Sequence, residues 1–400
     1  LEQSRSVSDL FAGPGNAGTA KIAQNLSDLD PLDTDAVLAA CRKHAIDLAV
    51  IGPEAPLVAG VVDLLTAAGI AAFGASRAAA QLEASKAFAK EFMARHKVPT
   101  ASYQRYLDIQ QAEPALRRSK CRLVVKRDGL ADGKGVLDSA NVNALVEFAR
   151  EGLKAGPIVL EEYLRGPELS VFVLITSSGY HLLLPYCADY KKQHEDELGL
   201  NTGGMGSISP VPWVSDELDQ RIRAEIVTPT VNGMVEEGLS YCGLLYIGLM
   251  ATADGPKVIE YNVRFGDPEA QALLPTLDTD LAALFQEISA GRTPPPPAQR
   301  GTAVVVVIAS GGYPEQYSTG LPVRLPVADP ERGLIFHANT HMRNRQVLTG
   351  GGRCFSAVGL DTNLTSAAEH AYELATQIWF EGGWFRRDIA AAYRGLAEPA

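Results

Sequence analysis

The sequence is poor in the residues that build disulfides and zinc sites. Its 400 residues include five cysteines and seven histidines, with no CxxC pair and no HExxH motif. The odd number and scattered positions of the cysteines predict reduced thiols, packed as small core residues in a cytoplasmic protein. Without paired Cys and His spacings, the sequence disfavours a structural zinc site.

Long apolar runs and basic tracts are also missing. No apolar run approaches the roughly 18 residues that span a bilayer, and the opening LEQSRSVSDL lacks the apolar block of a signal peptide. Acidic residues outnumber basic ones by 47 to 36, which gives a net charge of −11. This balance disfavours nucleic acid and anionic membranes as partners. Small anionic metabolites stay open, because a few basic groups and backbone amides can gather locally.

The length predicts two to four domains, since 400 residues exceed a typical single core. Alternating strands and helices within residues 1–83 predict an amino-terminal α/β unit with a parallel sheet. We expect a central domain at 84–291 with a flap subdomain at about 121–180, and a compact last domain at 298–400. The linker between them is RTPPPP, whose consecutive prolines favour extended geometry. The chain opens like the tail of a helix, so we also expect a strand and a glycine loop upstream.

One glycine-rich segment resembles a phosphate loop at first sight. It is VVKRDGLADGKGVL (124–137), which has three glycines and two lysines within ten residues. A P-loop has the pattern GxxxxGK followed by Ser or Thr, whereas Gly129 and Gly133 are only four apart and a glycine follows the second lysine. Lys126 ends an apolar strand, and the glycines let backbone amides turn toward phosphate oxygens. The alternative is a solvated strand end followed by an ordinary turn.

The segment VIEYNVRFGDPE (258–269) indicates a cation site. Strand alternation places Glu260 and Asn262 on one face, with Arg264 in phase. A carboxylate and an amide oxygen are ligands for a hard cation such as magnesium, which also takes oxygens from substrate phosphates. The arginine can fork onto a carboxylate or a phosphate. The alternative is an exposed polar strand face.

Four other segments have a functional and a structural interpretation. IVLEEYLRGPELS (158–170) either presents backbone groups to an adenine edge and a carboxylate to a ribose, or carries surface charge. DYKKQHEDELGLNTGGMG (189–206) is either a substrate loop that offers amides to an anion or a mobile acidic loop. GPGNAGTA (13–20) and GPEAPL (52–57) are ordinary turns or ligand loops at the carboxyl edge of a parallel sheet.

Together these segments resemble the ATP-grasp ligases and, more narrowly, the phosphoribosylamine–glycine ligase family, also called glycinamide ribonucleotide synthetases. The resemblance covers almost the whole chain, and NTGGMG and RFGDPE are its most specific parts. It implies the α/β fold class, in a chain of several domains that combine helices and strands (α+β multidomain). An ATP-grasp fold would follow a Rossmann-like amino-terminal domain and precede a small carboxy-terminal domain. The chain departs from the family pattern at Arg127 and Asp132, where alanine or another small residue is usual.

The resemblance also implies roles for individual residues. Those implied to bind ATP are Lys86, Lys126, Gly129, Gly133, Lys134, Gly135, Glu161, Glu162, Tyr163, Leu164 and Glu168. Those implied to lie near the substrates are Gly15, Asn16, Ala17, Pro53, Glu54, Asn201, Thr202, Gly203, Gly204, Met205, Gly206, Arg264 and Asp267. The implied metal ligands are Glu260 and Asn262, and the implied catalytic residues are Arg264, Asp189 and Lys126.

The implied reaction joins glycine to 5-phosphoribosylamine and gives glycinamide ribonucleotide, ADP and phosphate, through a glycyl phosphate, in purine biosynthesis. ATP with Mg²⁺ or Mn²⁺ is the expected cofactor. The protein is expected in the cytoplasm, and a monomer is compatible with the sequence. Two alternatives stay open at this point: a related carboxylate–amine ligase with another substrate, and an inactive nucleotide-binding regulator.

Overall fold

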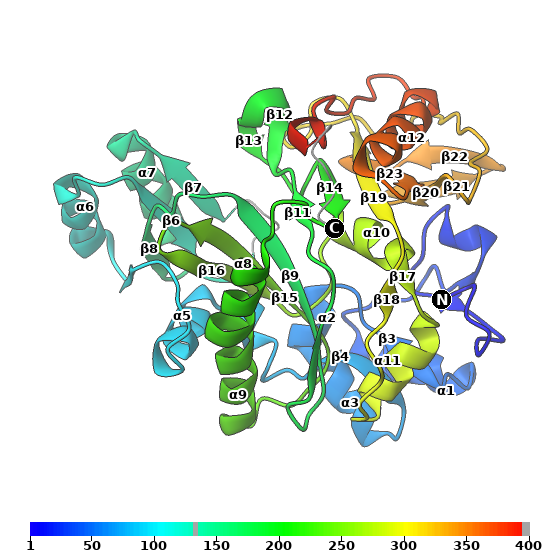
Figure 1. The fold of residues 1–400 in the computed structure, drawn as a ribbon, viewed down its shortest axis with the longest axis horizontal. Coiled ribbons are helices and arrows are strands. Elements are labelled where there is room, and N and C mark those ends of the chain that lie inside the picture. Colours follow the sequence, from blue (N-terminus) through cyan, green and yellow to red (C-terminus); the bar gives the residue numbers. More distant parts are fainter. Residues whose placement is uncertain (131–134, 394–400) are drawn as a thin grey trace.

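A mixed sheet of six strands runs through the centre of the molecule (Figure 1). The computed structural model describes residues 1–130 and 135–393, so Asp132, Gly133 and Lys134 of the predicted flap loop lie outside the described residues. The strand order is β10-β9-β15-β4-β3, and β16 also pairs with β15. The strands are β3 (Leu48–Val50), β4 (Ala71–Ala75), β9 (Glu168–Ile175), β10 (His181–Leu183), β15 (Tyr241–Thr252) and β16 (Gly255–Asn262).

Two further sheets flank the central one. The carboxy-terminal half contributes most of an antiparallel sheet with the order β11-β14-β19-β23-β20, formed by β11 (Ala188–Asp189), β14 (Gly206–Ser209), β19 (Thr302–Ala309), β20 (Gly333–His337) and β23 (Arg353–Asp361). A small sheet has the order β5-β8-β6-β7, formed by β5 (Tyr103–Tyr106), β6 (Leu123–Arg127), β7 (Val136–Ser139) and β8 (Ile158–Glu162). The small sheet therefore spans residues 103–162, whereas the sequence predicts a flap subdomain over about 121–180.

Eight short strands form two-stranded pairs: β1 (Phe11–Ala12) with β2 (Gln24–Asn25), β12 (Lys192–His194) with β13 (Leu198–Asn201), β17 (Leu277–Asp278) with β18 (Ala298–Gln299), and β21 (Thr340–Arg343) with β22 (Gln346–Thr349). The predicted amino-terminal parallel sheet is thus divided. Strands β1 and β2 pair in parallel by themselves, and β3 and β4 pair in parallel but join the central sheet through β15. Because β3 is an edge strand, its residues are partly exposed and not fully buried as a central strand would be.

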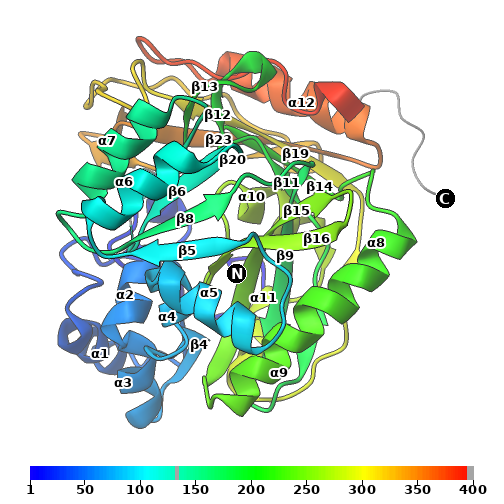
Figure 2. The ribbon, with the colours of Figure 1, turned by 90° about the vertical axis from the view of Figure 1, so that its left-hand side faces the viewer.

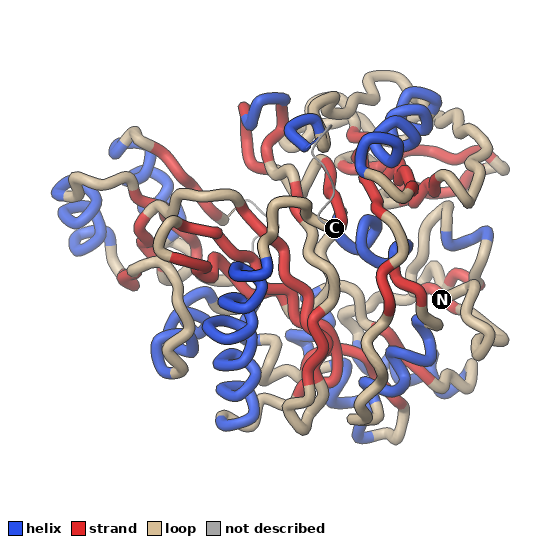
Figure 3. Tube along the Cα trace, in the orientation of Figure 1, coloured by secondary structure: helices blue, strands red, loops and turns tan. Residues whose placement is uncertain are grey.

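The helices lie around these sheets (Figure 3). They are α1 (Thr34–Lys43), α2 (Glu54–Ala59), α3 (Val61–Ala67), α4 (Gln81–Ala84), α5 (Lys86–Arg95), α6 (Ile109–Arg118), α7 (Val142–Gly152), α8 (Asp216–Arg221), α9 (Thr228–Glu236), α10 (Glu269–Leu273), α11 (Leu281–Ser289) and α12 (Leu364–Gln377). Single turns of 3₁₀ helix are η1 (Thr19–Lys21), η2 (Glu195–Glu197), η4 (Leu274–Thr276) and η5 (Ala391–Tyr393), and η3 (Ile222–Val227) is a π-helix. In residues 1–130 and 135–393, no helix combines the length and the apolar character needed to cross a membrane.

The helical segment that carries Lys86 is divided at Ser85 into α4 and α5. The backbone of this residue is extended, with φ −129° and ψ 114°, and its hydroxyl accepts a hydrogen bond from Phe88 N. A serine that caps a helix in this way stops the preceding helix and starts the next. The break makes Lys86 the first residue of α5, so its side chain can extend toward the loop after β6.

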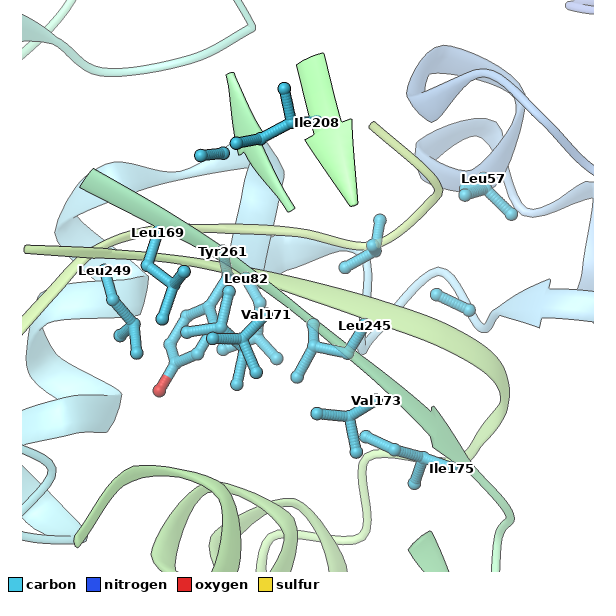
Figure 4. Packing of buried hydrophobic residues seen from close by; sticks show 14 of the residues in the cluster. Leu57, Leu82, Leu169, Val171, Val173, Ile175, Ile208, Leu245, Leu249 and Tyr261 are labelled. Carbon is cyan, nitrogen blue, oxygen red and sulfur yellow. The ribbon is translucent and has the colours of Figure 1, made fainter. Parts of the chain in front are cut away.

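The core is built on both faces of β9 and β15. Leu169, Val171, Val173 and Ile175 pack on one side of β9 with Leu245 of β15 (Figure 4), while Phe172 and Leu174 pack on the other side. Each fully buried aliphatic side chain contributes about 1.5–3 kcal/mol to stability. A strand that is buried on both faces is a rigid support for the charged residues at its end.

The small sheet has a separate core with α6 and α7, which includes Leu116, Val125, Leu145 and Ile158. Figure 2 shows β5 of this sheet beside α5, and in Figure 1 the sheet lies on the left, on the other side of the molecule from α12, β20 and β23. The contacts that join the small sheet to the body include buried ion pairs and hydrogen bonds of the residues described next.

Candidate active site

The end of β16 brings the two predicted metal ligands close to Arg264. Asn262 is buried, its Oδ1 accepts a hydrogen bond from Arg264 Nη2 at 3.3 Å, and its Nδ2 has no partner among the described residues. Strand β16 ends at Asn262, so Arg264 lies past the strand and contacts Asn262 through its side chain. Nδ2 is a donor, so an oxygen of a bound ligand would complete its hydrogen bonds, whereas a cation would be held by Oδ1.

Glu260 lies in a field of positive charge. Burial opposes its ionisation, but the charges of Lys191, Lys126 and Lys86 outweigh burial and lower the pKa of Glu260. The carboxylate is therefore ionised at neutral pH, as a cation ligand must be. Within residues 1–130 and 135–393, no three His, Cys, Asp or Glu side chains are grouped to hold a metal by themselves. Glu260 and Asn262 fit a magnesium ion that takes its other ligands from phosphate and water.

Arg264 is held by carboxylates from two other segments. Its Nη2 donates to Glu83 Oε1 at 2.8 Å and its Nε donates to Glu54 Oε2 at 3.1 Å. Burial raises the pKa of Glu83 to about 7, although Arg264 opposes the shift, and Val263 N also donates to this carboxylate at 2.7 Å. Sequence reasoning named Glu54 and missed Glu83, which lies three residues before Lys86 in the segment QLEASK. The arginine is thus oriented in advance for an anion.

The two predicted lysines reach the same region from different elements. Lys86 Nζ donates to Gly129 O at 2.9 Å, and Lys126 Nζ donates to Ile259 O at 2.9 Å. Burial lowers the pKa of Lys86, with Glu260 opposing the shift. Each ammonium group therefore contacts a backbone carbonyl beside a segment that the sequence links to phosphate or metal.

The residues of the segment predicted to face adenine differ in their surroundings. Glu161 is buried and forms ion pairs with Lys126 at 3.1 Å and with Lys90 at 2.9 Å; sequence reasoning missed Lys90. The Glu162 carboxylate accepts a hydrogen bond from Ser102 N at 3.0 Å. The guanidinium of Arg122 lies 4.1 Å from the centre of the Tyr163 ring. Leu164 follows, partly exposed.

Glu168 and Asp189 both lie beside Lys191, a lysine that is not among the site residues predicted from the sequence. Lys191 Nζ donates to Glu168 Oε2 at 2.6 Å and lies 3.9 Å from Asp189 Oδ2. Burial raises the pKa of Asp189 to about 8, with Lys191 opposing the shift and Glu269 adding to it. Burial alone would lower the pKa of Lys191, but the neighbouring Asp189 and Glu168 raise it well above its ordinary value. The sequence offered one indication of this lysine, its place in the DYKK segment two residues after Asp189.

The two most specific motifs touch each other. Gly204 has a φ of +108°, and a side chain there would collide with Pro268, so only glycine fits between the two loops. Arg353 of β23 ties the loops together, since its Nη1 donates to Gly203 O at 2.8 Å and also to the backbone carbonyl of Asp267. Residues 201–206 are held further by Thr202, whose Oγ1 donates to Lys191 O at 2.9 Å.

The first glycine loop is fixed to the carboxy-terminal sheet. Asn16 Nδ2 donates to His337 O at 2.8 Å and to Ala338 O at 3.1 Å, and Asn16 Oδ1 accepts from Thr19 N. Gly15 has a φ of +80°, and an added Cβ would collide with Asn25. Ala17 is buried behind this turn. The loop therefore has a defined shape before any ligand binds.

The second amino-terminal loop leads directly into the site. Pro53 precedes α2, and Glu54 is the first residue of that helix. Its carboxylate is the one that holds Arg264. Of the remaining predicted residues, Gly129 lies at a φ of +109° with open space around it, and Gly135 O accepts from Arg127 N at 2.8 Å. Arg127 itself stacks on Phe148, with the guanidinium carbon 4.3 Å from the ring centre.

Comparisons with known proteins match the whole length of the chain. Three models of phosphoribosylglycinamide synthetase match in order: the N domain at residues 1–83, the ATP-grasp (A) domain at 84–270 and the C domain at 303–392. The phosphoribosylamine–glycine ligase of Yersinia pestis is 41% identical, covering 99% of this chain and 95% of the relative. That of Salmonella typhi is 42% identical, covering 97% and 93%.

Solved structures agree with the sequence comparisons. The crystal structure of phosphoribosylamine–glycine ligase from Thermotoga maritima has a TM-score of 0.84 at 32% identity, covering 96% of this chain and 94% of that one. The biotin carboxylase domain of the Hydrogenobacter thermophilus 2-oxoglutarate carboxylase, solved with MgADP, has a TM-score of 0.73 at 16% identity, covering 94% and 86%. The second likeness supports the ATP-grasp fold alone.

Proposed function

The chain belongs to the phosphoribosylglycinamide synthetase family, and from that premise we propose that it joins glycine to 5-phosphoribosylamine while ATP is converted to ADP and phosphate. It is an ATP-dependent ligase of purine biosynthesis. The observation that carries the proposal is the convergence of Glu260, Asn262 and Arg264 with lysines from three other segments. These groups suit a reaction in which negative charge moves between phosphate and carboxylate oxygens.

The reaction proceeds in two steps. An oxygen of the glycine carboxylate attacks the γ-phosphorus of ATP, the bond to ADP breaks, and glycyl phosphate forms. The amine of phosphoribosylamine then attacks the glycyl carbonyl carbon, the C–O bond to phosphate breaks, and the amine loses a proton. The protein mainly positions the reactants and offsets charge. Magnesium, when bound, would neutralise charge on the phosphates.

Particular side chains have proposed roles in these steps. Glu260 and Asn262 hold the metal, and Lys86 and Lys126 bind phosphate oxygens. Arg264 orients the anion that accepts the phosphoryl group, because Glu54 and Glu83 fix its guanidinium plane. Asp189, with its pKa near 8, is matched to proton transfer from the amine near neutral pH.

The nucleotide and substrate loops have proposed roles as well. The segment from Glu161 to Leu164 contacts adenine. The carboxylate of Glu168 separates from Lys191 and then binds the ribose. Gly129 and Gly135 belong to the flap over the phosphates. The loops at 15–17, 53–54 and 201–206, with Asp267, bind glycine and the phosphoribosyl group. Mg²⁺ is the proposed metal and Mn²⁺ a substitute. The cytoplasmic location and the monomeric state stay predictions.

Glycine-dependent formation of ADP, with phosphoribosylamine generated in the assay, tests the proposal. We expect ADP release to require both glycine and phosphoribosylamine. One ADP should form for each molecule of product. ADP release with another amino acid or amine, and none with these two, would favour a related ligase. Nucleotide binding without turnover in any mixture would favour the inactive regulator.

Substitution of Arg353 by lysine tests how the substrate loops are held. Lysine keeps the charge but lacks the planar fork, in which Nη1 donates to Gly203 O while Nη2 donates to Asp267 Oδ2 at 3.4 Å. We expect the KM for glycine to rise about tenfold, from the loss of one charge-assisted hydrogen bond, with the KM for ATP unchanged. The control is Arg332→Lys, which alters an exposed ion pair with Glu373. Equal changes in both KM values would contradict the role.

A further inference from the structure

Lys90, Glu161 and Lys126 form a buried triad where the small sheet meets the body of the molecule. The side chains of Lys90 and Glu161 are only 2% and 4% exposed, and that of Lys126 is 5% exposed. The Glu161 carboxylate lies between the two ammonium groups, with Oε2 2.9 Å from Lys90 Nζ and Oε1 3.1 Å from Lys126 Nζ. Burial of three charges is costly unless each is paired, so this arrangement has to be accounted for.

Each lysine of the triad is also fixed to the central sheet. Lys90 Nζ donates to Thr100 Oγ1 at 2.7 Å, and this hydroxyl donates to Val258 O at 2.6 Å. Lys126 Nζ donates to the next carbonyl of β16, that of Ile259, at 2.9 Å. The triad therefore joins α5, β6 and β8 to β16, the strand that ends in the proposed metal ligands.

The contacts of Lys126 leave room for a ligand. An ammonium group has three N–H donors. Among the described residues Lys126 Nζ donates one hydrogen bond, to Ile259 O, and forms an ion pair with Glu161 Oε1, an oxygen that accepts no hydrogen bond. The carbonyl is fixed by the sheet and the carboxylate by Lys90, so the two contacts fix the position of the Lys126 ammonium group and keep N–H donors available for a ligand.

We propose that Lys90 is a positioning residue for nucleotide binding, because its ammonium group anchors the Glu161 carboxylate and thereby directs Lys126 toward the nucleotide. This inference rests on the proposed function, in which Lys126 and the segment after Glu161 contact ATP. Lys90 itself touches no substrate. Its effect reaches the nucleotide only through the other two members of the triad.

The charge of Lys90 gives the experiment a specific readout. Burial lowers the pKa of Lys90 to about 8, although Glu161 opposes the shift; Lys126 adds to it, and Glu162 opposes it. The ring of Tyr103 on β5 also faces this ammonium group, 5.7 Å from its centre. Lys90 is therefore charged and able to anchor Glu161 at pH 7, and mostly neutral at pH 9.

The test is the Kd for ADP with Mg²⁺, measured by titration calorimetry at pH 7 and pH 9 in the wild type and in Lys90→Met. We expect the wild-type Kd to rise about tenfold between these pH values, the ratio set by deprotonation of one group near pH 8. At pH 7 the variant should bind about tenfold more weakly than the wild type. At pH 9 the two Kd values should converge, because neither protein then has the charge.

Two further variants complete the experiment. Lys154→Met removes an exposed lysine of the small subdomain that pairs with Glu151, and it should retain the wild-type Kd and its pH dependence. Thr100→Val removes only the hydroxyl that fixes Lys90, and it should raise the Kd at pH 7 about threefold even if Lys90→Met fails to fold.

The outcomes separate this inference from the proposed function. Wild-type affinity in Lys90→Met, or an unchanged pH dependence in a folded variant, would overturn the positioning role and leave the proposed function standing. Wild-type affinity in Thr100→Val, when Lys90→Met does not fold, would also overturn it. Failure of the wild type to bind ADP at either pH would overturn both.

Discussion

Replacement of Glu260 by glutamine is expected to lower kcat roughly 10²- to 10³-fold while the protein stays folded. Glutamine keeps the size of the side chain but removes the negative charge that lies among Lys191, Lys126 and Lys86. In the proposed role the metal would lose a charged ligand, and the three lysines lose a shared counter-charge. Both effects weaken the stabilisation of charge during phosphoryl transfer.

Two measurements check this prediction beside turnover. The thermal unfolding temperature of Glu260→Gln should stay within a few degrees of the wild type. Addition of Mg²⁺ should tighten ADP binding in the wild type and have little effect in the variant. The control is Glu287→Gln on α11, which removes one carboxylate from an exposed pair with Arg292. Normal turnover by Glu260→Gln at limiting magnesium would refute the metal assignment.

Replacement of Arg264 by methionine should lower kcat/KM about 10³-fold and also reduce the stability. In the proposed role the substrate anion would lose a guanidinium group held in position, and Glu83 loses its ion-pair partner while it stays buried. Removal of one partner from a buried ion pair costs about 3 kcal/mol or more. The stability loss can be measured by denaturant unfolding and the catalytic loss by initial rates.

Measurements at two pH values and a double variant separate the loss of stability from the loss of catalysis in Arg264→Met. The pKa of Glu83 is raised to about 7 in the folded protein, so the folded state binds this proton more tightly than the unfolded state does. The stability contribution of the protonated form is lost as the pH rises through 7, so Arg264→Met should be less destabilised at pH 6 than at pH 8.

Adding Glu83→Gln to Arg264→Met should recover much of the stability, because glutamine carries no charge to bury. It should not recover activity, since the guanidinium is still missing. Recovery of activity together with stability would show that Arg264 serves the fold and not the anion.

Local sequence patterns predicted the parts of the site that lie close together in the chain. Glu260 and Asn262 are two residues apart on β16, so strand alternation was enough to place them together. The glycine-rich segments also occur as turns with positive φ at Gly15, Gly129 and Gly204. In each of these cases the geometry is determined within a few residues.

Contacts between distant segments could not be predicted in this way. The pair of Lys90 with Glu161 joins a helix to a strand 71 residues later, and Arg353 reaches loops 150 and 86 residues earlier. Nothing in the local pattern distinguishes Lys90 from a solvated helix lysine. Its burial depends on how the small sheet packs on α5, which is a property of the tertiary fold.

The fold was likewise predicted in part: the architecture was predicted, and two local features were not. The family resemblance implied the ATP-grasp architecture, and the comparisons confirm it. The break at Ser85 and the edge position of β3 were not predicted, because both depend on a choice between local alternatives that tertiary contacts decide.

The central claim is that the glycine carboxylate is activated as an acyl phosphate in this site. Glycine labelled with ¹⁸O in both carboxylate oxygens tests it most directly, since the oxygen that attacks the γ-phosphorus leaves with inorganic phosphate. We predict one ¹⁸O in phosphate for each turnover, measured by mass spectrometry, with the other retained in the amide product. Label found in AMP, or phosphate without label while product forms, would contradict the acyl-phosphate route and the assignment of Lys126, Glu260 and Arg264 to γ-phosphoryl transfer.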